Sequence, residues 1–434
     1  MPMPIWKQKS RILVTCPKGV TEYLKVEIEA LGFPILNEID TAIQTEGTLE
    51  DTMMLNLHLR TAQRVLYQLQ IFKVGSPGAL YERINSIAWE TLLHDSGRYA
   101  YVCITSIVDN PLITDSRFVN VKVKDAIVDR VREKQGSRPD SGPDKDKAVV
   151  HVYWKNDQAI VYLDTSGDRL SLRGYRKIPL LAPMQETLAA ALILATGWHG
   201  RGSFINPMCG SGTLAIEAAL IALNRPPGLL RNNYGFMYIK GFPHELWQEL
   251  RKKARNDSKR NLQFKIVATD IDDKAVQAAR QNAKTAGVDQ LIEFHTCSYE
   301  NTPVPEGRGV IFLNPPYGER MDAAFNKPQV SSRQEVKPGG KIIIRKAVDR
   351  KGNDGNKGSA MQRLEAIYQG VGDFFKNTGG GYRGYIFTGN LDMAKKVGLR
   401  TKRRLTFYNG EIECRLLEYE LYAGSRKNIA PGQE

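Results

Sequence analysis

Four consecutive residues, Asn314-Pro315-Pro316-Tyr317, combine groups that could act on a flat substrate bearing an amino nitrogen. They follow the apolar run VIFL, which we expect to be a buried strand that ends at the prolines, because proline has no N–H to donate. An exocyclic amino nitrogen is a poor nucleophile. Two acceptors aimed at its N–H bonds, the Asn314 side-chain oxygen and the Pro315 carbonyl, would favour a pyramidal nitrogen and stabilise positive charge during methyl transfer. Tyr317 offers a ring on which an extruded base could stack.

The tetrapeptide by itself leaves the substrate open. A turn that only ends a strand is the structural alternative. Adenine N6 and glutamine amides would be methylated by the same arrangement, so the pattern predicts only an amino or amide nitrogen. We treat all four residues as the candidate catalytic loop.

A second loop could hold the methyl donor. The stretch SFINPMCGSGTLAIEAA, from Ser203, is typical of a strand followed by a helix, with Gly210 and Gly212 in the turn. Glycine lets the backbone approach a ligand, and the helix N-terminus supplies N–H groups and a positive dipole end. Asp270 ends the next predicted strand, KIVATD, where its carboxylate can accept hydrogen bonds from ribose hydroxyls.

These features have alternatives too. Gly-x-Gly also occurs in ordinary tight turns, and Asp270 could cap a helix, although Asp272 would serve equally well. A phosphate-binding loop is excluded because no Lys-Ser/Thr pair follows the glycines. Nothing here would neutralise a pyrophosphate, so S-adenosylmethionine fits better than a dinucleotide.

The elements that position these loops indicate an α/β fold. From residue 184 onward, helical patterns alternate with short apolar strands, which predicts a doubly wound parallel sheet. Two final strand patterns joined by Asn409-Gly410 predict a closing antiparallel hairpin, as in class I methyltransferases. The preceding residues mix strands and helices in smaller α+β units. The expected divisions are 1–60, 61–165, a boundary linker over 166–183, and 184–434.

The amino-acid composition limits the classes of molecule that the protein is expected to bind. The chain carries 61 Lys+Arg against 47 Asp+Glu, a net charge of +14 and a pI near 9.4. This charge favours a nucleic acid partner, although a generic basic surface would also produce it. Five cysteines without a Cys-x-x-Cys pair argue against disulfides and zinc, and predict a reduced, cytoplasmic protein without a metal. No long apolar run or N-terminal apolar segment is present, so neither a membrane span nor secretion is expected.

Seven stretches in a fixed order cover nearly the whole chain: VKVKDAIVD (121–129), SGDRLSLRGYR (166–176), APMQETLAAA (182–191), NPMCGSGTLAIEAA (206–219), RPPGLLRNNYGF (225–236), TDIDDKAVQAARQNAKTAG (269–287) and LNPPYGERM (313–321). Through them the chain resembles the THUMP-domain RNA guanine-N2 methyltransferases, most closely the bacterial 23S rRNA branch. The resemblance implies a ferredoxin-like unit (1–60), a THUMP RNA-binding domain (61–165) and a class I, Rossmann-like methyltransferase domain. It also implies transfer of methyl from S-adenosylmethionine to guanine N2 in RNA.

The resemblance maps the family's cofactor loop onto 206–213, its ribose carboxylate onto Asp270 and its catalytic loop onto 314–317. The implied cofactor-binding residues are Asn206, Met208, Cys209, Gly210, Ser211, Gly212, Thr213, Asp270, Ile271, Ser298 and Asn314. Two positions depart from the family. Asn206 stands where the loop usually opens with Asp, and Ser298 aligns with an acidic residue near the adenine amine. Both can accept hydrogen bonds, so we expect cofactor binding to survive.

Residues 327–357 form an insertion relative to that family, with nine Lys/Arg against three Asp/Glu, a charge of +6. We hypothesise a basic flap or hairpin that grips RNA phosphates, with a solvated loop as the alternative. On a helix in 61–165, further basic residues could track RNA or belong to a solvated face. The candidate RNA contacts are Lys122, Lys124, Arg130, Arg132, Lys341, Arg345 and Lys346.

Two competing functions remain open. One keeps the chemistry but acts on tRNA or on adenine N6 in DNA, although the RNA-binding unit weighs against DNA. The other is a non-catalytic RNA-binding assembly factor, for which Asn206 and Ser298 are the only sequence support.

Overall fold

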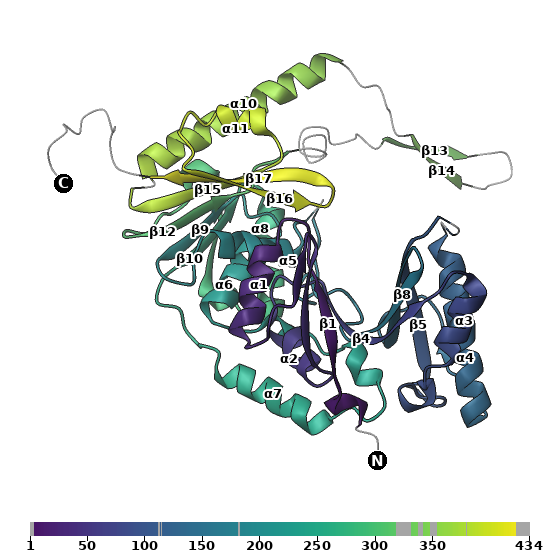
Figure 1. The fold of residues 1–434 in the computed structure, drawn as a ribbon. Helices are drawn as coiled ribbons and strands as arrows, with labels where there is room; N and C mark the ends of the chain where they lie inside the picture. The colour runs from purple at the N-terminus through teal and green to yellow at the C-terminus, as the bar shows by residue number, and fades with distance from the viewer. Residues whose placement is uncertain are drawn as a thin grey trace.

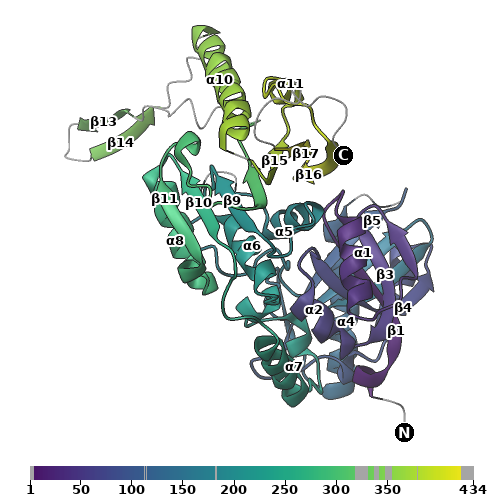
Figure 2. The ribbon, with the colours of Figure 1, turned by 90° about the vertical axis from the view of Figure 1, so that its left-hand side faces the viewer.

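A computed structural model describes residues 4–317 apart from 112, 114, 181 and 182, then 331–336, 342–347, and 354–421 apart from 379. The strands form two large sheets and a separate antiparallel pair (Figures 1 and 2). Within these ranges, no helix is long and apolar enough to cross a bilayer.

The first sheet runs without a break through the two N-terminal units. Its eight strands follow the order β2-β3-β1-β4-β8-β7-β5-β6. Strand β4 joins the units because its ten residues pair with β1 on one edge and with β8 on the other. The bounds are β1 Lys9–Thr15, β2 Asn37–Ile39, β3 Ala42–Thr48, β4 Arg64–Lys73, β5 Tyr101–Asp109, β6 Asp140–Ser141, β7 Ala148–Lys155 and β8 Gln158–Asp164.

The helices of this half are α1 (Thr21–Ala30), α2 (Asp51–His58), α3 (Pro77–Asn85) and α4 (Ser116–Gln135). Helices α3 and α4 pack together on one side of β5, β7 and β8 (Figure 1). Helix α4 begins where the Asp115 carboxylate accepts the Arg117 N–H at 2.9 Å, and it ends at Gly136 in the left-handed conformation. Its residues Val119, Val123, Ala126, Ile127 and Val131 are buried at helical spacing and hold it to the sheet.

The second sheet has seven strands in the order β11-β10-β9-β12-β15-β17-β16. Strands β9 to β12 and β15 are parallel, whereas β17 pairs antiparallel with β15 and with β16. The turn between β16 and β17 is Asn409-Gly410, so the predicted parallel sheet with a closing hairpin is confirmed. The bounds are β9 Ser203–Pro207, β10 Ile266–Asp270, β11 Ile292–Thr296, β12 Gly309–Leu313, β15 Tyr382–Thr388, β16 Arg403–Asn409 and β17 Ile412–Glu420.

Helices cover both faces of this sheet. On one face, α5, α6 and α8 share a continuous core with the N-terminal half. On the other face, α10 places Leu364, Tyr368, Val371 and Phe375 against the sheet, at spacings of one helical turn. The bounds are α5 Glu186–Ala195, α6 Thr213–Ala222, α7 His244–Asn256, α8 Asp273–Ala286, α10 Asp354–Thr378 and α11 Leu391–Lys395.

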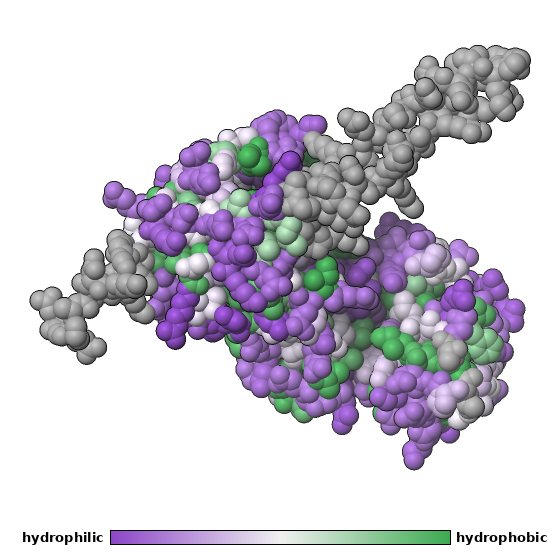
Figure 3. Space-filling view, turned by 90° about the horizontal axis from the view of Figure 1, so that it is seen from above, coloured by the Kyte–Doolittle hydropathy of each residue, from purple (hydrophilic) through white to green (hydrophobic). Residues whose placement is uncertain are grey.

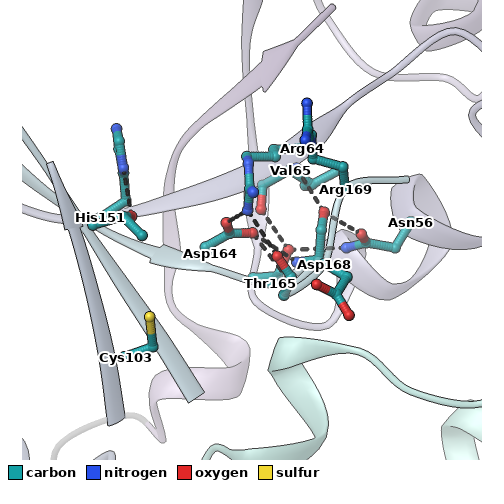
Figure 4. A network of polar contacts seen from close by, with 12 residues as sticks. Asn56, Arg64, Val65, Cys103, His151, Asp164, Thr165, Asp168 and Arg169 are labelled. Carbon is teal, nitrogen blue, oxygen red and sulfur yellow. Dashed lines mark hydrogen bonds and ion pairs between the residues drawn. The ribbon is translucent and has the colours of Figure 1, made fainter. Parts of the chain in front are cut away.

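A buried polar network ties the end of β8 to α2 and β4 (Figure 4). The Ser166 hydroxyl donates to Asn56 Oδ1 at 2.6 Å and accepts the Val65 N–H at 2.9 Å. Beside it, Arg64 forms an ion pair with Asp164, whose side chain is 1% exposed. The network fixes the point at which the chain leaves the first sheet.

The segment 166–183, which we expected to be a linker, packs against α6 through two of its residues. Arg173 and Tyr175 are both buried, and both reach the Glu217 carboxylate of α6, at 3.6 and 3.1 Å. Burial raises the pKa of Glu217, which Arg173 counteracts. The connection therefore holds the two halves together.

The surface seen from above is mostly hydrophilic, with scattered apolar residues (Figure 3). A notch separates the lobe that carries α3 and α4 from the rest of the molecule. In the predicted insertion, β13 (Ser331–Val336) pairs antiparallel with β14 (Ile342–Ala347) as a sheet of its own.

Candidate active site

A cavity of about 500 Å³ opens where β9, β10 and β12 end. Because these strands are parallel, their carboxyl ends meet at one edge of the sheet, where ligands bind in open α/β folds. The loop after β9, Asp270 at the end of β10 and Asn314 just after β12 all line the cavity. The two predicted loops are thus brought together.

The loop after β9 turns sharply through three residues with positive φ: Met208 (58°), Gly210 (54°) and Gly212 (81°). The two glycines serve different purposes. A Cβ on Gly210, which lines the cavity, would meet no atom within 4 Å, so its backbone faces open space. A Cβ on Gly212 would lie 2.8 Å from Ala279 Cβ, so Gly212 lets α6 approach α8.

Asp270 is tied to the glycine loop. Its Oδ2 accepts the Gly210 N–H at 2.9 Å, and its Oδ1 accepts the Asp272 N–H at 3.1 Å. Burial raises its pKa, and these N–H bonds partly offset the rise. Asp272, not Asp270, caps α8, because its carboxylate accepts the Lys274 N–H at 3.0 Å. The capping alternative for Asp270 is therefore wrong, and its carboxylate faces the cavity.

Asn314 lines the cavity, and its side-chain oxygen is unpaired. Its Oδ1 is buried and has no hydrogen-bond partner among the described residues. Leaving a buried acceptor unpaired costs about 1–3 kcal/mol, so such an atom calls for a partner that a ligand can supply. Pro316 also lines the cavity, and Pro315 is buried beside it.

Tyr317 lies differently from its expected role. Its ring is 2% exposed and packs edge-on against Phe387, with centroids 6.1 Å apart. Its hydroxyl accepts the Asn409 Nδ2–H at 3.0 Å. Tyr317 is not among the cavity residues, so this geometry does not support stacking of a base on its ring.

Most of the predicted cofactor residues line the cavity: Met208, Cys209, Gly210, Ser211, Thr213, Asp270, Ile271, Ser298 and Asn314. Asn206 and Gly212 do not. Asn206 is fully buried, and its Nδ2 donates to the Phe312 carbonyl at 2.9 Å, so it links β9 to β12 beneath the loop. Burial raises the pKa of the Cys209 thiol far above its usual range, which keeps it protonated.

Sequence reasoning missed part of the cavity wall. Leu180, Pro183 and Met184 come from the segment before α5, and Tyr299 and Ile367 from the opposite side. Arg176 positions this segment: its guanidinium donates to the Met184 carbonyl at 2.7 Å and to Thr213 Oγ1 at 3.2 Å. The stretch APMQETLAAA was the available signal, since it contains both Pro183 and Met184.

The cavity suits an uncharged nucleoside joined to a sulfonium. Asp270 can accept ribose hydroxyls, while Ile271, Pro183 and Met184 offer apolar surface for an adenine ring. Among the described residues, none that lines it is basic, so they provide no positively charged partner for a phosphate. In the described part of the chain, no cluster of His, Cys, Asp or Glu could hold a metal ion.

Three of the four candidate RNA contacts on α4 are engaged by acids. Arg130 forms two hydrogen bonds with Glu90, at 2.7 and 3.0 Å, and these lower the Glu90 pKa. Arg132 pairs with Asp129, and Lys124 with Asp125. The structure gives Lys122 no ion pair with a described residue. For the three paired residues, the structure therefore favours the alternative that they belong to a solvated helix face.

Of the candidates in the insertion, Lys341 lies outside the described residues. Arg345 and Lys346 belong to β14, opposite Arg333 and Ser332 of β13 in the strand register. The described backbone is thus a hairpin, one of the two forms we hypothesised.

Comparison with known proteins agrees with this architecture. Residues 11–66 match the RlmL ferredoxin-like domain, 77–164 the THUMP domain, and 173–330 the RMKL-like methyltransferase domain. The chain is 34% identical, over 95% of its length, to the ribosomal RNA large subunit methyltransferase K/L of Syntrophotalea carbinolica. It covers 53% of that protein, and so spans about half the length of the curated relatives that it matches.

Two solved structures share the whole fold. One is "a possible methylase" from Clostridium difficile 630, with a TM-score of 0.76 and 27% identity over 96% of this chain and 100% of that one. The other, described as a predicted N6-adenine-specific DNA methylase from Listeria monocytogenes, has a TM-score of 0.76 and 26% identity over 95% and 96%. The chain is thus a THUMP-domain protein with a ferredoxin-like N-terminal domain and an RMKL-like methyltransferase domain.

Proposed function

We propose that this chain transfers a methyl group from S-adenosylmethionine to the exocyclic N2 of a guanine in RNA, in the large-subunit ribosomal RNA. The observation that carries the proposal is the buried, unpaired Oδ1 of Asn314 at the edge of the cavity that Gly210 and Asp270 line. The THUMP domain and the name of the curated relative support RNA, and specifically ribosomal RNA. With an RNA substrate of this kind, the protein would work in the cytoplasm.

Each residue has a defined task. The Asp270 carboxylate accepts hydrogen bonds from the ribose hydroxyls of the cofactor. Gly210, which has no side chain, leaves space for the cofactor beside the backbone. When bound, S-adenosylmethionine supplies an electrophilic methyl group. The Asn314 side-chain oxygen and the Pro315 carbonyl accept the two N–H bonds of the guanine amine. Two acceptors on one nitrogen favour the pyramidal, positively charged state that methyl transfer creates. No strong base is needed, because the product ammonium is acidic.

Replacing the acceptor tests the assignment. We expect Asn314→Ala to lower kcat for ribosomal RNA methylation by roughly 10²–10³, the usual effect of removing one preorganised polar group from a reacting centre. Its affinity for S-adenosylmethionine, measured by calorimetry, should stay unchanged. Asn261→Ala, at an exposed loop residue, is the matched control. An Asn314→Ala enzyme that methylates at the wild-type rate would refute the mechanism.

Adenine N6 methylation is the competing chemistry, since one structural neighbour carries that description. Mass spectrometry of 23S ribosomal RNA and tRNA from a deletion strain separates the substrates. Loss of N2-methylguanosine from 23S RNA supports the proposal, whereas its loss only from tRNA, or loss of N6-methyladenosine, contradicts it. A chain that binds RNA but not S-adenosylmethionine would be an assembly factor.

A further inference from the structure

A smaller cavity lies at the seam between the methyltransferase domain and the N-terminal half of the chain. It has a volume of about 110 Å³ and is lined by Lys18, Gln63, Gln185 and Tyr408, among others. Lys18 lies in the β1–α1 loop and Gln63 just before β4, whereas Gln185 precedes α5 and Tyr408 belongs to β16. The walls therefore come from both halves of the chain.

Two short connections place this cavity next to the reacting centre. Gln185 follows Met184, which lines the larger cavity. On the other wall, Tyr408 and Gly410 flank Asn409, whose side chain donates to the hydroxyl of Tyr317 at 3.0 Å. In the proposed function, an RNA strand whose target base reaches Asn314 can therefore extend past the smaller cavity.

The groups in the smaller cavity suit one nucleotide. Lys18 Nζ lies over one face of the Tyr408 ring, 4.4 Å from its centroid, so a base can stack only on the other face of the ring. Lys18 forms no ion pair with a carboxylate of the described residues. The nearby Glu413, which accepts a hydrogen bond from the Tyr408 hydroxyl at 3.1 Å, is paired with Arg415 at 2.6 Å, so Lys18 retains charge for a phosphate. Gln63 and Gln185 approach each other at 3.5 Å and offer amide donors and acceptors to a base edge.

The seam is held rigidly from both sides. Tyr23 of α1 stacks on Phe407, with centroids 5.8 Å apart. A Cβ on Gly19 would lie 2.9 Å from the Thr406 carbonyl oxygen, so the loop that carries Lys18 packs directly on β16. Figure 2 shows this proximity, with α1 close to the end of the sheet that β16 and β17 form. A preformed site of this kind loses little entropy on binding.

A larger hollow of about 650 Å³ also borders Lys18 and Tyr408. Its walls include Glu22, Glu38 and Asp40, which would repel a phosphate. The RNA backbone is therefore favoured on the side of Gln63 and Gln185.

We propose that Lys18, Gln63, Gln185 and Tyr408, which border this cavity, contact the RNA nucleotide next to the methylated base, with its base on the open face of the Tyr408 ring and its phosphate on Lys18. This inference rests on the proposed function and adds the N-terminal ferredoxin-like domain to the substrate site. It makes the seam between the domains a part of substrate recognition.

The test measures RNA affinity separately from catalysis. Tyr408→Leu removes the aromatic ring on which the base would stack. We expect it to weaken the binding of in vitro transcribed 23S ribosomal RNA about tenfold, as measured by filter binding. The same measurement with 16S ribosomal RNA serves as the comparison. Tyr408→Phe keeps the ring and should bind like the wild type. Lys18→Met keeps the aliphatic stem and should reduce the salt dependence of log Kd by about one phosphate contact.

Lys252→Met, at an exposed residue of α7, is the matched control for Lys18→Met. Calorimetry with S-adenosylmethionine and the Tm should be unchanged in every variant. Wild-type RNA affinity in both Tyr408→Leu and Lys18→Met would overturn the subsite. So would an equal loss of S-adenosylmethionine affinity, because the residues would then act through the fold. If the wild type binds 23S RNA without methylating it, the proposed function fails, and the binding data still decide the subsite.

Discussion

Asp270 and Gly210 are joined by a hydrogen bond of 2.9 Å, from the glycine N–H to carboxylate Oδ2, across the ends of two neighbouring strands. A carboxylate oxygen can accept two hydrogen bonds, so this contact fixes the orientation of the group and leaves acceptor capacity toward the cavity. The loop that follows β9 and the carboxylate that ends β10 thus form one preorganised unit.

We expect Asp270→Asn to weaken S-adenosylmethionine binding about tenfold or more. A neutral amide accepts ribose hydroxyls less strongly than a carboxylate, for which a hydrogen bond contributes about 1.5–3 kcal/mol. Calorimetry measures the change. Asp272→Asn is the control, because asparagine caps a helix as well as aspartate does and Asp272 does not line the cavity. Equal affinities in the two variants would show that the Asp270 charge is not used.

The affinity should also depend on pH. Burial raises the pKa of Asp270 above the ordinary value of about 3.9. The charged form binds the ribose, so affinity is complete above the raised pKa and falls as pH drops through it. The stability of the ligand-free protein depends on pH in the opposite direction. The native state holds this proton more tightly than the unfolded chain, so the contribution of Asp270 to stability decreases as pH rises from about 3.9 through the raised pKa. Calorimetry with S-adenosylmethionine across this pH range should show an affinity that depends on pH in the wild type and depends less on pH in Asp270→Asn.

The site could be predicted from sequence where its residues stand at the ends of strands. Asn314, Gly210 and Asp270 each follow a short apolar run, and parallel strands bring such positions to one edge. The orientation of Tyr317 could not be predicted, because its ring is held by Phe387 and Asn409, which lie far along the chain. Local pattern does not specify such contacts.

The same limit applies to the fold. Strand alternation and the Asn409-Gly410 turn sufficed to predict the second sheet. The first sheet appeared in sequence as two units, because nothing local shows that β4 pairs with strands from both. The packed segment before α5 was also missed, since the buried contact of Arg173 with Glu217 is visible only in three dimensions.

The two loop glycines should respond differently to alanine. Gly212→Ala places a methyl group 2.8 Å from Ala279 Cβ and strains the backbone, so we expect a loss of about 2–4 kcal/mol in the free energy of unfolding. Gly210→Ala meets open space and should lose only about 1–2 kcal/mol from backbone strain. Its methyl group faces the cavity, so it should weaken S-adenosylmethionine binding. Urea unfolding and calorimetry together distinguish the variants, and the reverse ranking in stability would contradict this assignment.

The ion pair between Arg64 and Asp164 should matter for stability mainly because each charge compensates the other (Figure 4). Burial raises the pKa of Asp164, and Arg64 opposes that rise, so the carboxylate depends on its partner. We expect Arg64→Ala to lower the free energy of unfolding by about 3–5 kcal/mol, because it leaves an uncompensated buried charge. The double variant Arg64→Met/Asp164→Asn removes both charges and keeps an oxygen that accepts the Ser166 and Gly167 N–H groups, so it should recover part of this loss. Urea unfolding measures both, and a double variant as unstable as Arg64→Ala would mean that the penalty comes from lost packing. Neither residue lines the cavity, so S-adenosylmethionine affinity should be unchanged while the proteins are folded.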